Sequence, residues 1–409
     1  MLRHIFQGED CLGNNKNWEK RMKIMVLGGV GWIGSTLTKV LAEHPEVDEV
    51  VIGDLDEARS KKLIAEIGTG KVSYRKVDVY DHDGLVKSMK DMDSVANALW
   101  YEFALRVTKA AIDARIPLTD LGGMAELTKQ QLDCHEEAKK AGILNIIGCG
   151  ETPGISNVLA RWGADRMDSI DSIHIRDGEW GKDSLEWLQY SVRTSMDEMT
   201  EPSIIYKDGE YVDLPPRSGR EMYTFPDPIG EQECFTVPFE EAVTFPKFLG
   251  KSVNLVEMKV TVSKLLMDNF DILEQFGVTS PEPVTTRAGV TVPPVDVLIA
   301  CILKMDIPPR KERTHSCIAI EMKGTLKGEK VQRSIYGLMQ DWKGKEGKWK
   351  VDAEGYKTAL PCALSAVMLA KGEIAHRGVL PPEACLEPVS FLEELKKWGL
   401  KVGDSIKKI

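Results

Sequence analysis

A glycine-rich turn between an apolar run and an amphipathic segment is the feature that most constrains the fold of this chain. Residues 23–34 read KIMVLGGVGWIG, so Gly29, Gly31 and Gly34 have the spacing G-x-G-x-x-G. That spacing, after a strand and before a helix, is typical of a βαβ unit that binds a dinucleotide. In such a unit the first glycine permits the tight turn out of the strand. The second lets the backbone approach a pyrophosphate, and the third lets the helix pack close to the sheet.

The segments that follow support this interpretation. A helix over residues 35–43 would aim unpaired N–H groups and the positive end of its dipole at the phosphates. The next apolar run, VVIGDLD, reaches Asp54, whose carboxylate can accept hydrogen bonds from both ribose hydroxyls. A 2′-phosphate would meet that carboxylate, so NAD is favoured over NADP, although Arg59 is close enough in sequence to bind such a phosphate. The loop residues predicted to contact the cofactor are Gly29, Val30, Gly31, Trp32, Ile33 and Gly34.

Strand-like and helix-like segments alternate from Lys23 to about Gly150. The strand-like segments are KIMVLGG, EVVIGDL, VSYRKVDV, SVANALW, IPLTDLGG and ILNIIGCG. The helix-like segments between them cover 35–43, 58–67, 83–89, 103–114 and 129–140. This alternation predicts a Rossmann-type, doubly wound parallel sheet, whose functional loops follow the carboxyl ends of the strands. Asp78 and Asn97 lie at such ends and join Asp54 as predicted cofactor-binding residues, although Asn97 is also a good residue to cap the next helix.

The pattern changes after Gly154. Strand-like runs such as SIDSIHIRDG and HSCIAIEMKGTL follow one another without regular crossover helices, and KGTLKGEKVQ is typical of a hairpin with its turn at 327–329. We therefore predict an inserted α+β domain built on a mostly antiparallel sheet. The predicted divisions are an N-terminal extension over 1–21, a Rossmann domain over 22–150, a substrate-binding and dimerisation domain over 151–355, and a C-terminal segment over 356–409 that returns to the Rossmann domain.

Composition excludes several classes of function. The net charge of −10 argues against nucleic acid or an anionic membrane surface as the main partner. The chain has no apolar run long enough for a membrane span, and its first 21 residues lack the apolar stretch of a signal peptide. The 8 cysteines are scattered without zinc-ligand spacing, which favours reduced thiols in a cytoplasmic protein and predicts no metal site.

Two carboxylates are the predicted catalytic residues. Asp120 ends the fifth strand-like segment, where it could face the cleft between the domains; the alternative is a turn residue that binds its own backbone. Glu151 lies in the loop GCGETPG between the two domains, close to the reactive end of a bound cofactor; the alternative is a hinge with a solvated side chain.

The predicted substrate-binding residues are Tyr101, Glu179 and Arg193. Arg193 is chosen because a guanidinium can bind a substrate carboxylate through two parallel hydrogen bonds, although surface arginines are far more common than such clamps. None of the 7 histidines lies in a recognisable motif, so no catalytic histidine is assigned.

The order of these landmarks resembles the saccharopine dehydrogenase-like family, in its lysine 6-dehydrogenase branch. The matching segments are VLGGVGWIG, GDLD, NALWYEF, TDLGG, GETPGISNVL and KGEIAHRGVLPPE, and the resemblance runs from about Lys23 to Gly399. It implies a Rossmann domain with an inserted α/β domain, a homodimer paired through that inserted domain, and NAD(P)-dependent interconversion of an amine with an imine or carbonyl. The substrate implied is a small amine or amino acid. One departure is the pair Glu240 and Glu241, which would suit a cationic substrate or be ordinary solvated charge.

The chemistry of amine oxidation explains why a carboxylate is sought. Hydride leaves a C–H bond only when the neighbouring nitrogen is neutral, so a base must remove the proton of an ammonium. An extended short-chain dehydrogenase or epimerase is disfavoured, because it needs a lysine four residues after its tyrosine and no tyrosine here has one. A non-catalytic NAD(P)-binding sensor or assembly protein remains the alternative of a different class.

Overall fold

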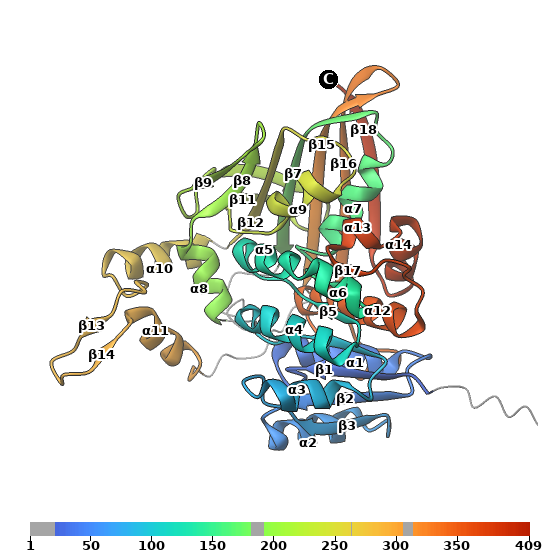
Figure 1. Cartoon of the computed structure of the whole chain (residues 1–409). Coiled ribbons are helices and arrows are strands. Elements are labelled where there is room, and N and C mark those ends of the chain that lie inside the picture. Colours follow the sequence, from blue (N-terminus) through green and yellow to red (C-terminus); the bar gives the residue numbers. More distant parts are fainter. Residues whose placement is uncertain (1–20, 181–191, 263, 306–313) are drawn as a thin grey trace, which may run out of the picture.

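Two sheets organise the chain, one parallel and one mostly antiparallel (Figure 1). The computed structural model describes residues 21–180, 192–262, 264–305 and 314–409. The predicted extension over 1–21 therefore lies almost wholly outside the described residues. The prediction of a Rossmann-type sheet joined to a second, mostly antiparallel sheet is confirmed.

The parallel sheet has seven strands in the order β17-β6-β5-β4-β1-β2-β3. Its strands are β1 Lys23–Leu27, β2 Glu49–Asp54, β3 Val72–Lys76, β4 Ser94–Asn97, β5 Leu118–Asp120, β6 Leu144–Ile146 and β17 Gly378–Leu380. Its inner strands are short apolar runs because helices cover both faces: Ile24 to Leu27 of β1 are wholly buried. The strand order reverses between β1 and β4, and ligands of such sheets bind outside the strand ends at this point.

The crossover helices of this sheet are α1 Trp32–Glu43, α2 Glu57–Ile67, α3 His82–Met89, α4 Ala104–Ala114, α5 Ala125–Asp133 and α6 His135–Ala141, with a short 3₁₀ turn, η1, at Tyr101–Phe103. Helix α1 begins at Trp32, three residues earlier than its sequence pattern predicted. The helix expected over 129–140 is two helices that meet at Cys134. Asp56 and Asp81 cap α2 and α3 through their side chains, as short acidic residues commonly do.

The second sheet has nine strands, with the path β10-β11-β12-β7-β15-β16-β18 and with β8 and β9 attached to β12. Its strands are β7 Ser169–Trp180, β8 Ser203–Lys207, β9 Glu210–Leu214, β10 Glu221–Phe225, β11 Gly230–Thr236, β12 Leu255–Thr261, β15 His315–Leu326, β16 Glu329–Gln340 and β18 Lys401–Lys408. Only the pair β12–β7 is parallel among these strands. The predicted hairpin joins β15 to β16, with Lys327 and Gly328 at positive φ in its turn.

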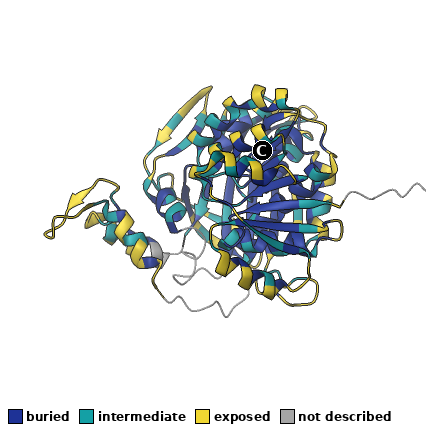
Figure 2. Ribbon diagram, turned by 60° about the horizontal axis from the view of Figure 1, so that its bottom comes forward, coloured by how far each residue is buried: buried dark blue, intermediate teal, exposed yellow. Residues whose placement is uncertain are grey.

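An arm projects from the second sheet (Figures 1 and 2). It consists of α10 Lys264–Gln275, the small hairpin β13 Val284–Thr285 and β14 Thr291–Val292, and α11 Pro294–Ile302. The helices α7 Ile155–Ala164, α8 Val192–Thr200 and α9 Glu241–Phe248 lie closer to the body of the molecule. Apolar side chains stay exposed on the arm, above all Phe276 at 79% and Leu303 at 69%.

The C-terminal segment connects the two sheets. Helix α12, Ala353–Lys371, packs on α1, and β17 then forms the edge of the parallel sheet beside β6. After the helices α13 Pro382–Cys385 and α14 Pro388–Lys397, the last strand β18 joins the second sheet beside β16. The predicted return to the first sheet therefore describes β17, whereas residues 401–408 extend the other sheet.

Candidate active site

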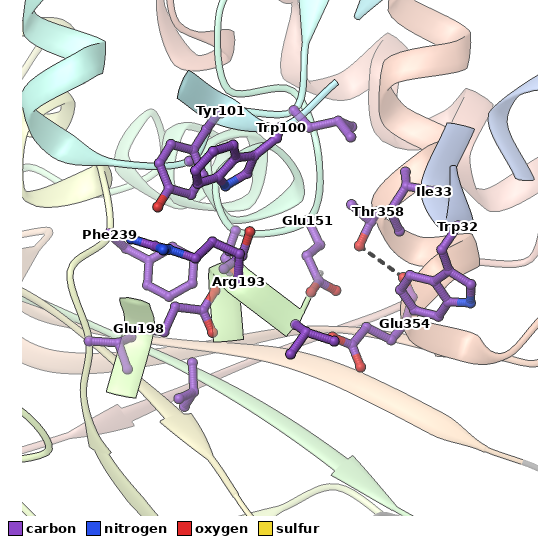
Figure 3. A pocket seen from close by; sticks show the side chains of 18 of the residues that line it. Trp32, Ile33, Trp100, Tyr101, Glu151, Arg193, Glu198, Phe239, Glu354 and Thr358 are labelled. Atoms are coloured by element: carbon purple, nitrogen blue, oxygen red, sulfur yellow. Dashed lines mark hydrogen bonds between the residues drawn. The ribbon is translucent and has the colours of Figure 1, made fainter. Parts of the chain in front are cut away.

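A pocket of about 470 Å³ lies between the glycine loop and the second sheet. Its size suits a small ligand or the reactive half of a larger one. Figure 3 shows the side chains that line it. The lining includes Gly31, Trp32, Tyr101, Glu151, Asp177, Arg193, Glu198, Phe239, Val260, Ile299, Leu303, Glu354 and Thr358. These residues come from the loops and helices that follow strands of the parallel sheet, from strands and helices of the second domain, from the linker between the two and from α12, so no single domain forms the pocket.

The glycine loop has the shape that a dinucleotide requires, with one correction to the predicted roles. Gly28, and not Gly29, takes the positive φ (70°) of the tight turn after β1. A Cβ on Gly34 would lie 2.0 Å from the carbonyl oxygen of Gly28, so no larger residue fits where α1 begins. Gly31 caps α1 and lines the pocket. The first turn of α1 thus presents its N–H groups at a close-packed loop, which is a ready site for phosphates.

Asp54 and Arg59 hold Val30 from two sides. The backbone N–H of Val30 lies 3.4 Å from Oδ2 of Asp54, and a guanidinium nitrogen of Arg59 donates to the carbonyl oxygen of Val30 at 2.6 Å. A carboxylate and a cation therefore stand together at the ribose end of the predicted cofactor site. The sequence favoured NAD because of Asp54 and named Arg59 as a residue that could bind a phosphate, and the structure places both side chains beside the same loop.

Two other predicted cofactor residues make local contacts instead. Asp78 is exposed and accepts a hydrogen bond from the N–H of Tyr80 at 2.9 Å. Asn97 is buried, and its Oδ1 accepts from the N–H of Leu99 at 3.2 Å. Neither side chain lines the pocket, whereas Ala98 and Leu99 do. Asn97 therefore shapes the turn after β4, and it does not cap the next helix, because the N-cap residues of η1 and α4 are Trp100 and Phe103.

Asp120 lies beneath the pocket rather than in it. Its side chain is 2% exposed and accepts hydrogen bonds from the N–H groups of Gly122 and Gly148 and from Nε2 of Gln131. Burial raises the pKa of Asp120, and these three hydrogen bonds oppose the shift. Asp120 thus holds together the two loops that follow β5 and β6. Its predicted role as a base in contact with substrate has no support in this position.

Glu151 does line the pocket, and a buried lysine stands behind it. The Nζ of Lys357, on α12, lies 2.8 Å from a carboxylate oxygen of Glu151 and 2.8 Å from Oδ1 of Asp177, on β7. The Lys357 side chain is wholly buried, and it also donates to Ser316 of β15. Glu151 and Asp177 are 13% and 12% exposed, so both carboxylates keep an open side toward the pocket.

The environment of Glu151 places its pKa where a proton can be exchanged near neutral pH. Burial raises the pKa of Glu151 to about 8; the Lys357 ammonium opposes this rise, and the carboxylates of Asp177 and Glu179 add to it. For Lys357, burial alone would lower the pKa, but Asp177 and Glu151 outweigh burial and raise it above its ordinary value. A charged lysine therefore faces a carboxyl group that can both accept and release a proton.

Arg193 and Tyr101 line the other side of the pocket and share one partner. Arg193 pairs through Nε with Asp197 at 3.0 Å and through a terminal nitrogen with Asp296 of α11 at 2.8 Å. The hydroxyl of Tyr101 donates to the same Asp197. The charge of Arg193 is thus already matched by two carboxylates. Glu179, the third predicted substrate residue, is buried on β7 and is not among the residues that line the pocket.

The pocket is acidic as a whole. Among the described lining residues, the carboxylates are Glu151, Asp177, Glu198 and Glu354, and the cation is Arg193. In the view of Figure 3, Glu354 lies on the Trp32 side of Glu151 and Glu198 on the opposite side. Phe239, Ile299 and Leu303 supply apolar surface. Such a wall attracts a cationic ligand that has methylene groups between its charges.

Comparison with protein families identifies the chain. Residues 24–146 match the model described as saccharopine dehydrogenase NADP binding domain, and residues 150–400 match the saccharopine dehydrogenase C-terminal domain. The chain belongs to the saccharopine dehydrogenase family. It is therefore an NAD(P)-dependent oxidoreductase of that family, and the family resemblance of its motifs is confirmed.

Two curated relatives match almost the whole chain. A carboxynorspermidine synthase of Vibrio alginolyticus is 24% identical over 397 residues, which cover 91% of this chain and 94% of the relative. A carboxyaminopropylagmatine dehydrogenase of Synechocystis is 23% identical over 389 residues, with 92% and 96% covered. Among solved structures, apo saccharopine dehydrogenase (L-Glu forming) of Saccharomyces cerevisiae has a TM-score of 0.72 at 16% identity, covering 94% of this chain and 100% of the yeast chain, and so shares its fold.

These comparisons refine two predictions about function. The relatives support amine chemistry in general and not the lysine 6-dehydrogenase branch in particular. The first domain model carries NADP in its description, so a nicotinamide cofactor is supported while the choice of NAD is not settled.

No helix in the described part of the chain is long and apolar enough to cross a membrane. No cluster of candidate metal ligands occurs among the same residues.

The sequence reasoning missed most of the substrate side. The sequence analysis does not single out Lys357, Glu354 or Thr358. One signal was present for Lys357, which is the second residue of a long, mostly apolar helical run from Tyr356 to Leu369, where a buried lysine needs a partner. Asp177 alternates with Glu179 along β7, a spacing that puts both on one face of the strand. The side chains of Glu240 and Glu241 are neither solvated nor in the pocket, because both are buried, Glu240 beside the loop of Gly123 and Glu241 beside Ser156 of α7.

Proposed function

We propose that this protein interconverts a carboxylated polyamine with an imine, or with the aldehyde and amine that form it, using NAD(P). The observation that carries the proposal is the acidic pocket beside the glycine loop, whose arginine is already paired with Asp197 and Asp296. A substrate with several ammonium groups suits a lining that carries the four acidic side chains Glu151, Asp177, Glu198 and Glu354. The names of the two long relatives, carboxynorspermidine synthase and carboxyaminopropylagmatine dehydrogenase, describe molecules of this kind.

The reaction balances as an oxidation at a C–N bond. A secondary ammonium group first loses a proton from nitrogen and then a hydride from the carbon beside that nitrogen, which leaves a protonated imine. Water then adds to the imine carbon, and the C–N bond breaks to give an aldehyde and a primary amine. Bound NAD(P) supplies the hydride acceptor, or the hydride donor when the reaction runs toward the secondary amine.

Glu151 is the residue proposed to exchange the proton with the substrate nitrogen. Its side chain opens into the pocket and has a pKa of about 8, so it is matched to proton transfer near neutral pH. In the oxidative direction the carboxylate removes the ammonium proton before hydride leaves. In the reductive direction the protonated acid assists loss of water from the adduct of amine and aldehyde.

The remaining pocket residues bind and orient. Glu198 and Glu354 are proposed to attract the cationic groups on either side of the reacting nitrogen. Phe239, Val260 and Leu303 are proposed to contact the methylene groups between them. For the cofactor, Asp54 supports a preference for NAD, and the nearby Arg59 supports measurable use of NADP.

Turnover of NAD(P)H with short diamines or guanidino amines, each paired with a small amino acid aldehyde, tests the proposal. We expect oxidation of NAD(P)H and a secondary amine product by mass spectrometry. The oxidative rate should rise with pH through about 8 and the reductive rate should fall, because the first needs Glu151 ionised and the second needs it protonated. Absence of turnover with every amine and both cofactors would refute the proposal and favour a non-catalytic sensor.

Glu151→Gln should reduce kcat by about 100-fold or more, which is the usual contribution of a positioned acid or base. The matched control is Glu102→Gln, an exposed neighbour of the pocket loop that should keep the rate of the natural chain. NAD(P)H affinity, measured by fluorescence, should stay unchanged in both variants. Equal rates in the two variants would contradict the role of Glu151.

A further inference from the structure

A buried charge cluster joins three distant segments directly behind the pocket. Lys357 of α12 contacts Glu151 in the linker, Asp177 on β7 and Ser316 on β15. Both nitrogen–carboxylate distances are 2.8 Å, and the lysine itself has no exposed surface. Lys357 therefore cannot touch a ligand in the pocket, but its two carboxylate partners can.

We propose that Lys357 is a positioning residue that fixes the carboxyl group of Glu151 against the pocket and balances its charge against Asp177. The inference rests on the proposed function of Glu151. The geometry gives the lysine two effects. It removes rotational freedom from a side chain that must meet the substrate nitrogen, and it supplies positive charge on the side away from the substrate.

The groups that face Glu151 come from every element packed against it. Helix α12 contributes Lys357, and β7 contributes Asp177 and Glu179. Strand β15 places the hydroxyl of Ser316 and the buried thiol of Cys317 near the lysine, and burial keeps that thiol protonated by raising its pKa to about 12. The one cation in this set is Lys357, and the anions next to Glu151 are Asp177 and Glu179.

This arrangement predicts opposite effects for the two partners. Replacement of Lys357 by a neutral residue removes the charge that favours ionised Glu151, so its titration midpoint should move to higher pH. Replacement of Asp177 by asparagine removes a negative charge that repels ionised Glu151, and Lys357 then pairs with one carboxylate, Glu151, instead of two. The titration midpoint of Glu151 should therefore move to lower pH. Loosened packing alone would not move the two midpoints in opposite directions.

The experiment compares Lys357→Met, Lys357→Arg and Asp177→Asn in the full chain. The pH profile of kcat should shift upward by about one pH unit or more in Lys357→Met, downward in Asp177→Asn, and less in Lys357→Arg than in Lys357→Met because the charge is kept. Thermal unfolding and NAD(P)H affinity serve as controls for folding. Unchanged midpoints, or shifts of both variants in one direction, would overturn the assignment.

An infrared titration makes the outcome independent of turnover. The carbonyl band of protonated Glu151 is identified by its absence in Glu151→Gln, and its midpoint is followed in each variant. If no substrate is found, the proposed function fails, while this midpoint still decides whether Lys357 controls Glu151. If Lys357→Met does not fold, Asp177→Asn decides: a downward shift supports the assignment and an unmoved midpoint overturns it.

Discussion

The two halves of the pocket are built in different ways. The cofactor half uses neighbouring residues: Gly28 and Gly31 lie in the turn after β1, Gly34 lies in the first turn of α1, and Asp54 ends the next strand along the chain. The substrate half gathers side chains from the linker, β7, α8 and α12, which are far apart in sequence. A substitution in the cofactor half must distort the local backbone, whereas a substitution in the substrate half can change one side-chain charge and leave the backbone in place.

This contrast explains how a family can keep its cofactor and change its substrate. Close backbone packing leaves few alternatives at the glycine loop. Side chains such as Glu198 and Glu354 are half-buried, and the fully buried faces of their helices are formed by other residues. If these side chains bind substrate as proposed, we expect substitution there to alter which ligand binds at little cost in the free energy of unfolding.

The largest effect is expected at the glycine loop. In Gly34→Ala the new Cβ would meet the carbonyl oxygen of Gly28 at 2.0 Å, so the backbone must shift. We expect a loss of about 1–3 kcal/mol in the free energy of unfolding and at least tenfold weaker NAD(P)H binding. Denaturant titration and fluorescence binding measure both. In the matched variant Gly31→Ala the Cβ has 3.2 Å to the same atom, so binding should weaken while stability changes less. Equal stability of the two variants would contradict the steric account.

The substrate half should respond through charge. Glu198→Gln and Glu354→Gln should each raise KM for a polycationic amine about tenfold, equivalent to about 1.4 kcal/mol, with a smaller change in kcat. The dependence of kcat/KM on salt should also become less steep. The control is Glu201→Gln, at an exposed position directly after α8. If both pocket variants have the same KM as the Glu201→Gln control, the acidic side chains of the pocket do not determine substrate binding.

The smallest effect is expected at the ribose end of the cofactor. Asp54→Ala should weaken NAD binding by about 1 kcal/mol through lost hydrogen bonds, and should improve NADP binding because Arg59 then faces a phosphate without an opposing carboxylate. Titration with both cofactors gives the two dissociation constants. An unchanged ratio would show that Asp54 does not select the cofactor.

Local sequence patterns predict the order of the strands and the loops that contribute to the pocket. Glu151, Tyr101 and Arg193 line one pocket. The loop positions of Glu151 and Tyr101 suggested this, whereas Arg193 was chosen because a guanidinium can bind a carboxylate, and it lies on α8. Asp120 and Asn97 are the last residues of β5 and β4, yet their side chains accept hydrogen bonds from neighbouring backbone N–H groups instead of lining the pocket. The end of a strand can be read from sequence, whereas the direction of its last side chain depends on which loops pack beside it.

Long-range pairing accounts for what was missed. Lys357 meets Glu151 and Asp177 only because α12 returns across both sheets, and no local pattern encodes that return. The predicted homodimer and cytoplasmic location stay predictions. Two exposed apolar side chains of the arm, Phe276 and Ile272, lie outside the pocket lining, and sedimentation of charged variants at these positions would test association of two copies.

The position of the C-terminal segment also determines when this enzyme can mature during its synthesis. Strand β17 completes the edge of the first sheet by pairing Gly378 with Leu144, and β18 completes the edge of the second sheet. Until the ribosome has released these strands, β6 and β16 each lack a hydrogen-bonded neighbour on one side, and until the earlier helix α12 has emerged, Glu151 also lacks its lysine. The nucleotide loop of a nascent chain is therefore made long before the rest of the site, so a product truncated before α12 should aggregate rather than turn over substrate.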